Sequence, residues 1–414
     1  MKLLWTWTLV LCFALPVCVA SELFDRVEEA LTFSGPEGRV RGRLSGMVEL
    51  EGYALQPPFP GVIQTDRDQL FAPRLIVFVD AQAGSHLYLF AQARADRGFD
   101  PGEGKGAVRL DEYALRYTPW KSGVFNAQIG KFATIVGNWA GRHSGWSNPF
   151  ITAPLPYEYL TGIWDTEAIR TSNVLLQWSH VRPGLPAAIS AFEKSLRIPI
   201  VWGPSYATGM AVAGDEGRLR YAAEVKSGSL SSRPEAWHHS REQRHHPTVS
   251  GRVGFRPNQM WDLGLSACGG AYLRESAGRS VAIDHGRGDY QQWVLAHDVA
   301  FAWRHWQVWG EVYASRFEIP NVGDADTLAY YVEAKYKFTP QFFGALRWNE
   351  QRFATIPDRG KRTRWGHDVW RIDVAPTYRF TPHTQLKFQY SLQHGDSAPR
   401  QTTRTMAVQA VVRF

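Results

Sequence analysis

The chain has 414 residues, a formal net charge of +7, and 13 % aromatic residues that include 17 tryptophans. Its mean hydropathy is −0.30, and no segment after residue 20 approaches the ~18 apolar residues of a membrane-spanning helix, which excludes a helical membrane protein. Many aromatic residues with modest hydropathy suit a transmembrane β-barrel, because its strands alternate between apolar and polar residues. A large array of soluble β-sandwiches is the alternative.

Residues 1–20 have the pattern of a secretory signal peptide. Lys2 precedes an apolar run from Leu3 to Leu15, and the segment Pro16-Val17-Cys18-Val19 leads to the small residue Ala20. The run is too short to span a membrane as a helix. We predict cleavage after Ala20, which would leave Cys268 as the remaining cysteine and allow no intramolecular disulfide in the exported chain.

Residues 21–38 follow, and we interpret them as a periplasmic lead with helical character that breaks at Gly35-Pro36. From residue 39 onward, segments with a period of two recur to the end of the chain, as expected for strands between two unlike media. The candidate strands are 40–52, 73–82, 86–95, 107–118, 123–132, 166–179, 187–193, 206–214, 218–229, 248–257, 260–272, 289–302, 305–317, 327–338, 341–353, 367–380, 384–394 and 402–414.

The connections between these segments alternate between short turns and long polar loops. Ala83-Gly84-Ser85 is a short one, for example, and 133–165 is a very long one. A barrel inserted from one side produces this alternation. We therefore predict an all-β fold, a transmembrane up-and-down antiparallel β-barrel over residues 39–414 in the cell outer membrane. Eighteen strands are preferred, and sixteen are possible because 187–193 and 206–214 are short and weakly patterned.

The two faces of the strands differ in charge. One parity, such as Leu386, Phe388 and Tyr390, is nearly without charge and should face lipid. The other carries charges of both signs with an excess of arginine and lysine, among them Lys335, Arg379 and Arg413. Because side chains cannot fill a barrel of this size, we expect water inside it and a passive diffusion pore that favours small hydrophilic anions. Ladders of arginine and glutamate that only brace the wall are the alternative for each single residue.

The connection 133–165 is the third long loop, and it is rich in proline, glycine and aromatic residues. This composition suits docking against the inner wall, where the loop would narrow the channel. Lys131, Arg142 and Arg116 are the first candidates for lining the constriction, although Lys131 could instead snorkel at its strand end. The other pore-lining candidates are Glu112, Arg94, Arg220, Arg252, Lys335, Arg347 and Arg371.

Asp111–Trp120 and Phe125–Gly137 together resemble the region that leads into the third loop of the phosphate-selective porin family. In that family a strand ending in Gly-Lys-Phe precedes the constriction loop, and Ile129-Gly130-Lys131-Phe132 matches it here. The resemblance is confined to these two segments. It implies a Gram-negative outer-membrane porin, whereas the loop itself lacks the dense basic cluster that phosphate recognition would need.

The last strand, Thr402–Phe414, resembles the final strand of Gram-negative outer-membrane barrels, which commonly ends in phenylalanine. The resemblance implies that Phe414 is read by the barrel assembly machinery. The partners expected for such a protein are outer-membrane lipid and lipopolysaccharide, with a homotrimer as a further possibility. No cofactor and no nucleic acid is expected.

Three rival functions are weaker. His238, His239, His245 and His246 lie in the fifth predicted long loop and could bind a metal ion, but a solvated basic loop is the simpler interpretation. An outer-membrane lipid hydrolase would need a serine beside the lipid-facing His297, and the neighbouring lipid-facing positions carry none. An export channel or sheath for a periplasmic partner would have the same charged lumen, and the sequence does not separate it from a porin.

Overall fold

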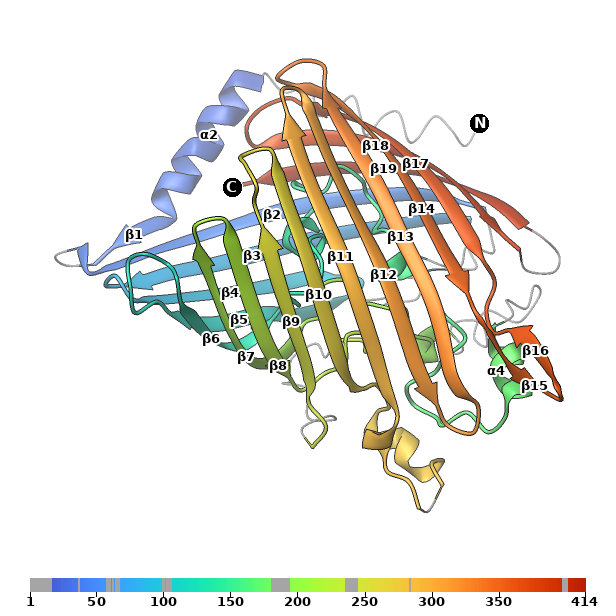
Figure 1. Cartoon of the computed structure of the whole chain (residues 1–414). Coiled ribbons are helices and arrows are strands. Elements are labelled where there is room, and N and C mark those ends of the chain that lie inside the picture. Colours follow the sequence, from blue (N-terminus) through green and yellow to red (C-terminus); the bar gives the residue numbers. More distant parts are fainter. Residues whose placement is uncertain are drawn as a thin grey trace, which may run out of the picture.

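The computed structural model describes residues 17–35, 38–56, 61, 63, 68–98, 101, 106–179, 194–234, 245–282, 284–396 and 401–414. Most of them build one large antiparallel sheet of 17 strands (Figure 1). Without the three-residue strand β1 (Thr32–Ser34), the remaining 16 strands form a closed barrel. Neighbouring strands pair in chain order, and the last one, β19, closes the ring on β2.

The strands of the barrel vary in length with their position around the ring. Their bounds are β2 Val40–Leu55, β3 Gln69–Ala83, β4 Leu87–Asp96, β5 Ala107–Tyr117, β6 Asn126–Phe132, β7 Ala207–Glu216, β8 Leu219–Lys226, β9 Thr248–Phe255, β10 Trp261–Ala271, β11 Gln291–Trp303, β12 Trp306–Ile319, β13 Gly323–Lys337, β14 Phe342–Phe353, β17 Val369–Arg379, β18 Thr384–Gly395 and β19 Gln401–Arg413.

The preferred count of eighteen strands is wrong, and the second choice of sixteen is confirmed. The predicted strand 166–179 is instead an irregular segment followed by helix α4 (Ser172–Ser179), because its apolar residues fall on one helical face around the fully buried Leu175. The predicted strand 187–193 lies outside the described residues. The other weak candidate, 206–214, is strand β7.

The remaining elements lie in the connections. Strands β15 (Thr355–Asp358) and β16 (Lys361–Arg364) form a separate hairpin in the loop between β14 and β17. The helices are α2 Val17–Ala30, α3 Leu155–Glu158 and α4, with short 3₁₀ turns η2 Ala140–Arg142, η3 Glu275–Arg279 and η4 Arg287–Asp289. None of the helices in the described part of the chain is both long and apolar enough to cross a membrane.

The short turns and the long loops gather at opposite ends of the barrel. Helix α2 and the C-terminus lie at the short-turn end, and the hairpin β15–β16 and helix α4 lie at the long-loop end (Figure 1). The N-terminal segment 21–38 continues through β1, which pairs with β2 beside the barrel. The predicted signal peptide 1–20 lies mostly outside the described residues.

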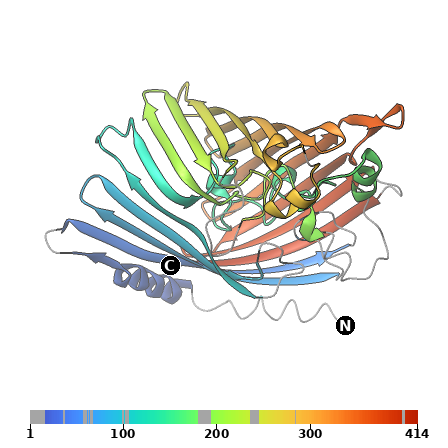
Figure 2. The same cartoon turned by 90° about the horizontal axis from the view of Figure 1, so that it is seen from below.

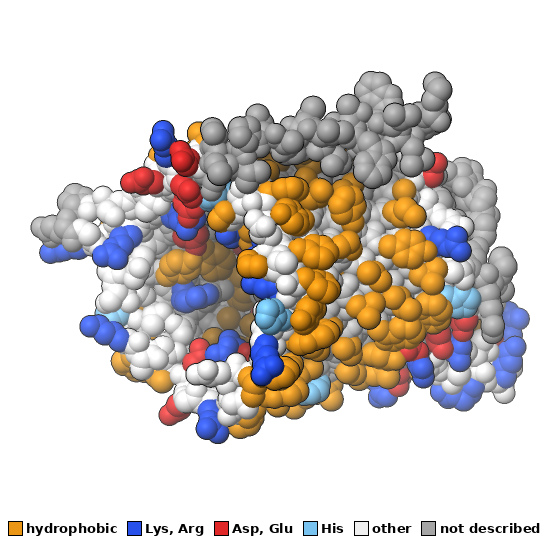
Figure 3. Space-filling view, turned by 90° about the horizontal axis from the view of Figure 1, so that it is seen from above, with side chains coloured by type: hydrophobic (Ala, Val, Ile, Leu, Met, Phe, Trp, Pro, Cys, Tyr) orange, Lys and Arg blue, Asp and Glu red, His pale blue; other side chains and the backbone are white. Residues whose placement is uncertain are grey.

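Side chains alternate between the two faces of each strand, as the period of two predicted. On β18, for example, Phe388 is 46 % exposed on the outside, whereas its neighbour Lys387 points inward and is fully buried. Apolar side chains cover the outside of the barrel (Figure 3). A closed barrel with such a band satisfies every backbone group internally, which is the condition for a β-structure in the outer membrane.

Candidate functional site

The connection between β6 and β7 spans residues 133–206, and its first part enters the ring of strands (Figure 2). We call it the third loop, and it is longer than the predicted 133–165 because 166–179 does not return to the wall as a strand. Its first part, residues 133–153, is named the front limb here. The front limb contacts the inner wall on one strand after another, so the loop docks into the lumen as its composition predicted.

Wall carboxylates accept hydrogen bonds from the front limb. Glu224 of β8 accepts from the Thr134 hydroxyl at 2.8 Å. On β12, Glu311 accepts from the backbone N–H of Trp139 at 2.9 Å. On β2, Glu49 accepts from the backbone N–H of Gly145 at 2.9 Å. These carboxylates satisfy N–H groups that an irregular loop cannot pair with itself.

Wall cations bind the carbonyl groups of the same limb. The Lys387 ammonium donates to the carbonyl oxygens of Gly145 and Asn148, both at 2.6 Å. The Arg347 guanidinium donates to the carbonyl oxygen of Thr152 at 3.1 Å. Arg347 and Lys387 are both fully buried, so the loop has replaced the water that would otherwise solvate these charges.

His143 and Arg142 of the front limb have shifted pKa values. Burial lowers the pKa of the His143 imidazole to about 4 from its ordinary 6.5, and the Arg94 guanidinium adds to this effect. The neutral ring meets the Ala140 carbonyl oxygen at 2.6 Å and the Tyr206 hydroxyl at 2.9 Å. Burial alone would lower the pKa of Arg142, but Tyr331 and its ion-pair partner Glu333 outweigh burial and raise it.

The third loop fills the middle of the barrel. All sixteen barrel strands carry at least one inward side chain that is buried there. One example from each strand is given by Glu49, Ile76, Gln92, Asp111, Phe132, Ala207, Glu224, Ser250, Ser266, Ala296, Glu311, Glu333, Arg347, Arg371, Lys387 and Gln409. The sequence indicated water at this level because wall side chains cannot span so wide a barrel. The structure places a loop there instead.

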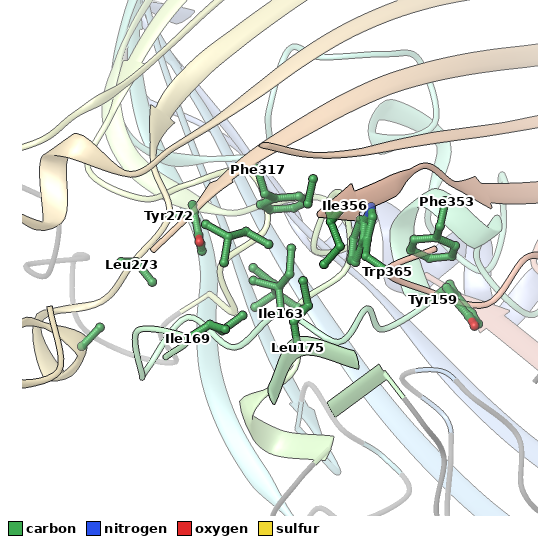
Figure 4. Close-up of a cluster of buried hydrophobic side chains, with 14 of the residues drawn as sticks. Tyr159, Ile163, Ile169, Leu175, Tyr272, Leu273, Phe317, Phe353, Ile356 and Trp365 are labelled. Carbon is green, nitrogen blue, oxygen red and sulfur yellow. The ribbon is translucent and has the colours of Figure 1, made fainter. Parts of the chain in front are cut away.

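A second layer of the loop lies nearer the long-loop end and is apolar. Leu155, Ile163, Ile169 and Leu175 of the third loop pack against side chains from the neighbouring long loops and strand ends, among them Tyr272, Leu273, Phe317, Phe353, Ile356 and Trp365 (Figure 4). We name residues 155–179 the rear limb. Its apolar contacts join it to the long loops, whereas the front limb makes both polar and apolar contacts with the inner wall.

Of the three leading candidates, Lys131 is fully buried, and its ammonium donates a hydrogen bond to the Leu110 carbonyl oxygen of β5 at 2.8 Å. Arg142 lies on the front limb against β13, on the opposite side of the ring. Arg116 lies at the short-turn end of β5, where Gln128 accepts from its guanidinium at 2.9 Å. The structure does not bring these three residues to one constriction, and their role in selectivity stays a prediction.

Most of the other predicted pore-lining residues take part in wall contacts. The arginines form ion pairs with carboxylates on the same strand or one or two strands away, and Glu112 accepts a hydrogen bond from the backbone N–H of Ala133 at 2.9 Å. The pairs are Arg94–Asp111 at 3.1 Å, Arg220–Asp262 at 2.6 Å, Arg252–Asp298 at 2.7 Å, Arg347–Asp373 at 2.9 Å and Arg371–Asp373 at 3.1 Å.

Lys335 differs from these residues. It lies at the short-turn end of β13 with its ammonium 4.3 Å from the centre of the Phe343 ring, and the described residues offer it no carboxylate. Arg379 and Arg413 lie close to it on β17 and β19, with their guanidinium carbons 4.9 and 4.1 Å from the centre of the Trp146 ring. The inward charge pattern had marked all three. The contact of Trp146 with the two arginines is a tertiary contact that no local sequence pattern encodes.

Two cavities remain inside the barrel near its short-turn end. One of about 430 Å³ is lined by Glu112, Arg116, Gln128 and Arg252 among others. The second, of about 640 Å³, is lined by Arg218, Arg256, Asp262 and Trp309 among others. Lys and Arg side chains line the hollow that is visible from this side (Figure 3). We call the short-turn end of the lumen, from these two cavities to Lys335, Arg379 and Arg413, the basic vestibule.

Comparison with known proteins finds solved structures with a similar architecture. No protein-family model and no curated protein sequence matches the chain. Among solved structures, OmpF of Salmonella typhi in complex with daunomycin aligns with a TM-score of 0.56 at 11 % identity, over 91 % of this chain and 98 % of its own. The outer-membrane channel DcaP of Acinetobacter baumannii gives 0.55 at 11 %, over 92 % and 99 %. An anion-selective porin from Comamonas acidovorans gives 0.53 at 10 %, over 91 % and 100 %.

The chain has the fold of the outer-membrane porins. With identities this low, the likeness extends to the architecture alone. It agrees with the expectation of a Gram-negative outer-membrane barrel.

The rival sites can be located on this porin barrel. With sixteen strands the histidine-rich loop is the fourth long loop, and His238 and His239 lie outside the described residues, whereas His245 and His246 lie at its end. Within the described ranges no group of three possible ligands is placed to hold a metal ion. His297 does face outward, but its partners across β10 and β12 are Leu265 and Val312, and neither residue can act as a nucleophile.

Proposed function

We propose that this porin-fold protein is an outer-membrane channel for passive diffusion of small hydrophilic solutes, that it favours anions, and that its third loop restricts the passage. A porin-like channel is what the fold and its structural neighbours support. The preference for anions rests on the charges in the vestibule.

One observation carries the anion preference. In the middle of the barrel most wall arginines are paired with carboxylates, so this layer is close to neutral. At the short-turn end, Lys335, Arg379 and Arg413 have no carboxylate within ion-pair distance among the described residues. Uncompensated positive charge in a narrow lumen with low-dielectric walls raises the local concentration of anions.

The orientation of the channel follows from the same architecture. An even number of strands places both chain ends on one side, and in outer-membrane barrels the short turns face the periplasm. The basic vestibule would then open toward the periplasm and the apolar layer of long loops toward the exterior. A homotrimer, contact with lipopolysaccharide and assembly through Phe414 belong to the same proposal.

Single-channel recording of the purified protein in a planar bilayer tests this function. We expect discrete current steps, a small conductance because the third loop occupies the middle, and a reversal potential in a salt gradient that reports anion preference. Replacing Lys335, Arg379 and Arg413 together by glutamine should shift that potential toward cations. Arg316→Gln is the control, because it makes the same kind of replacement on the outer face of β12. A cation-selective wild type, or no current from a folded barrel, would contradict the proposal.

The sheath for a periplasmic partner remains the rival function. Such a barrel needs a lumen wide enough for its partner, whereas here the third loop crosses the lumen and bonds to strands on different sides of the ring, among them β2, β8, β12, β14 and β18. The filled lumen therefore favours the restricted channel.

A further inference from the structure

Two guanidinium groups contact the same indole ring, that of Trp146 on the front limb of the third loop. The guanidinium carbons of Arg413 and Arg379 lie 4.1 and 4.9 Å from the centre of the Trp146 ring. Trp146 itself comes from the front limb and packs against a small apolar cluster on the inner wall that contains Met47 and Val411. The ring is thus fixed by the wall and offers its π-system to both cations.

Each guanidinium is also tied to the wall through one nitrogen only. Arg379 donates from Nε to the side-chain oxygen of Gln385 at 3.2 Å. Arg413 donates from Nε to the carbonyl oxygen of Pro382 at 2.8 Å. Among the described residues, no acceptor takes a hydrogen bond from the terminal amino groups of either side chain. The two arginines are therefore oriented, and their four terminal nitrogens are available as donors.

A third cation, Lys335, and one carboxylate, Glu28, lie at the same end of the barrel. Lys335 lies over the Phe343 ring at 4.3 Å, and the same ring is 5.5 Å from the guanidinium carbon of Arg379. Helix α2 brings Glu28 toward this end of the barrel, but Glu28 forms its ion pair with Arg43. The cluster therefore has three positive charges without a paired carboxylate.

We propose that Arg379 and Arg413, oriented by Trp146 and supported by Lys335, form a binding site for one small oxyanion with two negative charges. Planar guanidinium groups recognise carboxylate, phosphate and sulfate oxygens through paired N–H donors, and such charge-assisted hydrogen bonds are the strongest in proteins. Two guanidinium groups that are already oriented bind a dianion better than a monovalent ion, because each group can bind a separate negatively charged oxygen. This site deepens the proposed function by naming the class of solute that the vestibule retains.

The third loop is part of the site, which distinguishes it from a general basic wall. Without Trp146 the two guanidiniums would keep their charge but lose the ring that fixes their planes. Losing this preorganisation weakens binding although no direct contact to the anion is removed. Anion affinity should therefore depend on a residue of the front limb that carries no charge.

Equilibrium dialysis of the purified, detergent-solubilised barrel tests the site without requiring current. The probes are radiolabelled orthophosphate, sulfate and succinate, each offered over a range of concentrations against a fixed chloride background. We expect saturable binding of one dianion per chain for at least one probe, and the three arms identify which oxyanion fits. Arg379→Gln and Arg413→Gln should each weaken it about tenfold or more, because each removes a charged donor pair.

Two further variants separate the site from net charge. Trp146→Leu keeps every charge and should still weaken binding several-fold, whereas Arg316→Gln removes one positive charge on the outer face and should leave binding unchanged. Heat-modifiability on unboiled gels confirms that each variant is folded. No saturable binding by folded wild type, or equal weakening by Arg316→Gln, would overturn the site. Because dialysis needs no conduction, a barrel that binds the anion but passes no current would refute the channel and leave the site standing.

Discussion

At the scale of single residues, the inner wall of this barrel is unusual for the charges that it hides. Lys387 and Arg347 are fully buried, and a buried charge is tolerated only when it is paired or hydrogen-bonded. Their partners are carbonyl groups of the front limb, which in turn have no regular partner of their own. The charged side chains of the wall and the backbone groups of the irregular loop therefore satisfy each other's hydrogen bonds. These hydrogen bonds explain why a charged lumen can enclose a loop.

His143 makes docking of the front limb sensitive to pH. Its folded pKa of about 4 lies below the ordinary value of 6.5 because burial disfavours the charged ring. Docking is therefore fully stable above pH 6.5 and loses stability as the pH falls toward 4, since the released loop binds a proton that the docked loop excludes. We expect faster hydrogen exchange in residues 133–153 at pH 5 than at pH 7.5, after correction for the intrinsic rate.

The matched variant His143→Gln removes the titrating group and keeps a polar side chain. It should flatten this pH dependence while the exchange of the barrel strands stays as in the wild type. Equal acid sensitivity in both proteins would assign the effect to another group.

At the scale of elements, the two limbs of the third loop are held by different forces. The rear limb buries Leu155, Ile163 and Leu175 in an apolar cluster, which water does not replace. The front limb makes many hydrogen bonds, each with a small net contribution because water offers a substitute, and its apolar side chains are divided among separate clusters on the wall. The front limb should therefore detach first, with the rear limb as its anchor.

Cys268 reports on that detachment. It faces inward on β10, is 5 % exposed, and packs in the same cluster as Val136 and Trp139 of the front limb. Lys387→Met removes the ammonium that holds two loop carbonyls and should raise the reaction rate of Cys268 with a charged thiol reagent about tenfold. The control Lys121→Met alters an exposed lysine in the turn between β5 and β6. If both variants react like the wild type, Lys387 does not hold the limb closed.

The elements also show what the sequence could predict. Alternating apolar and polar residues located the barrel strands, because burial on one face alone imposes a period of two. The same pattern failed at 166–179, where a short apolar run serves a helix as well as a strand. Local patterns also marked Lys335, Arg379 and Arg413 as inward. The contact of Arg379 and Arg413 with Trp146 depends on how the third loop lies across the lumen, and that arrangement is set by long-range contacts.

At the scale of the whole molecule, the barrel exists only if its last strand meets its first described barrel strand. Strand β19 pairs with β2 from Arg413↔Met47 to Thr405↔Leu55. At the end of this seam, the backbone N–H of Phe414 donates to the Gly46 carbonyl oxygen at 3.0 Å, and the N–H of Gly46 donates back at 2.9 Å. A closed ring has no exposed strand edge, so the seam protects the whole sheet from pairing with other chains.

The Phe414 ring completes this seam by covering Gly46. A Cβ added at Gly46 would lie 2.6 Å from the Phe414 ring and 2.8 Å from the Ile76 carbonyl oxygen, so only glycine fits beneath the ring. We expect Phe414→Ala to lower the thermal midpoint of barrel unfolding on heat-modifiability gels, with a loss of about 1 kcal/mol for a half-buried aromatic ring. Phe414→Leu keeps an apolar cover and should recover most of the loss. If Phe414→Ala melts like the wild type but reaches the outer membrane in smaller amounts, the residue acts in assembly and not in the closure of the folded ring.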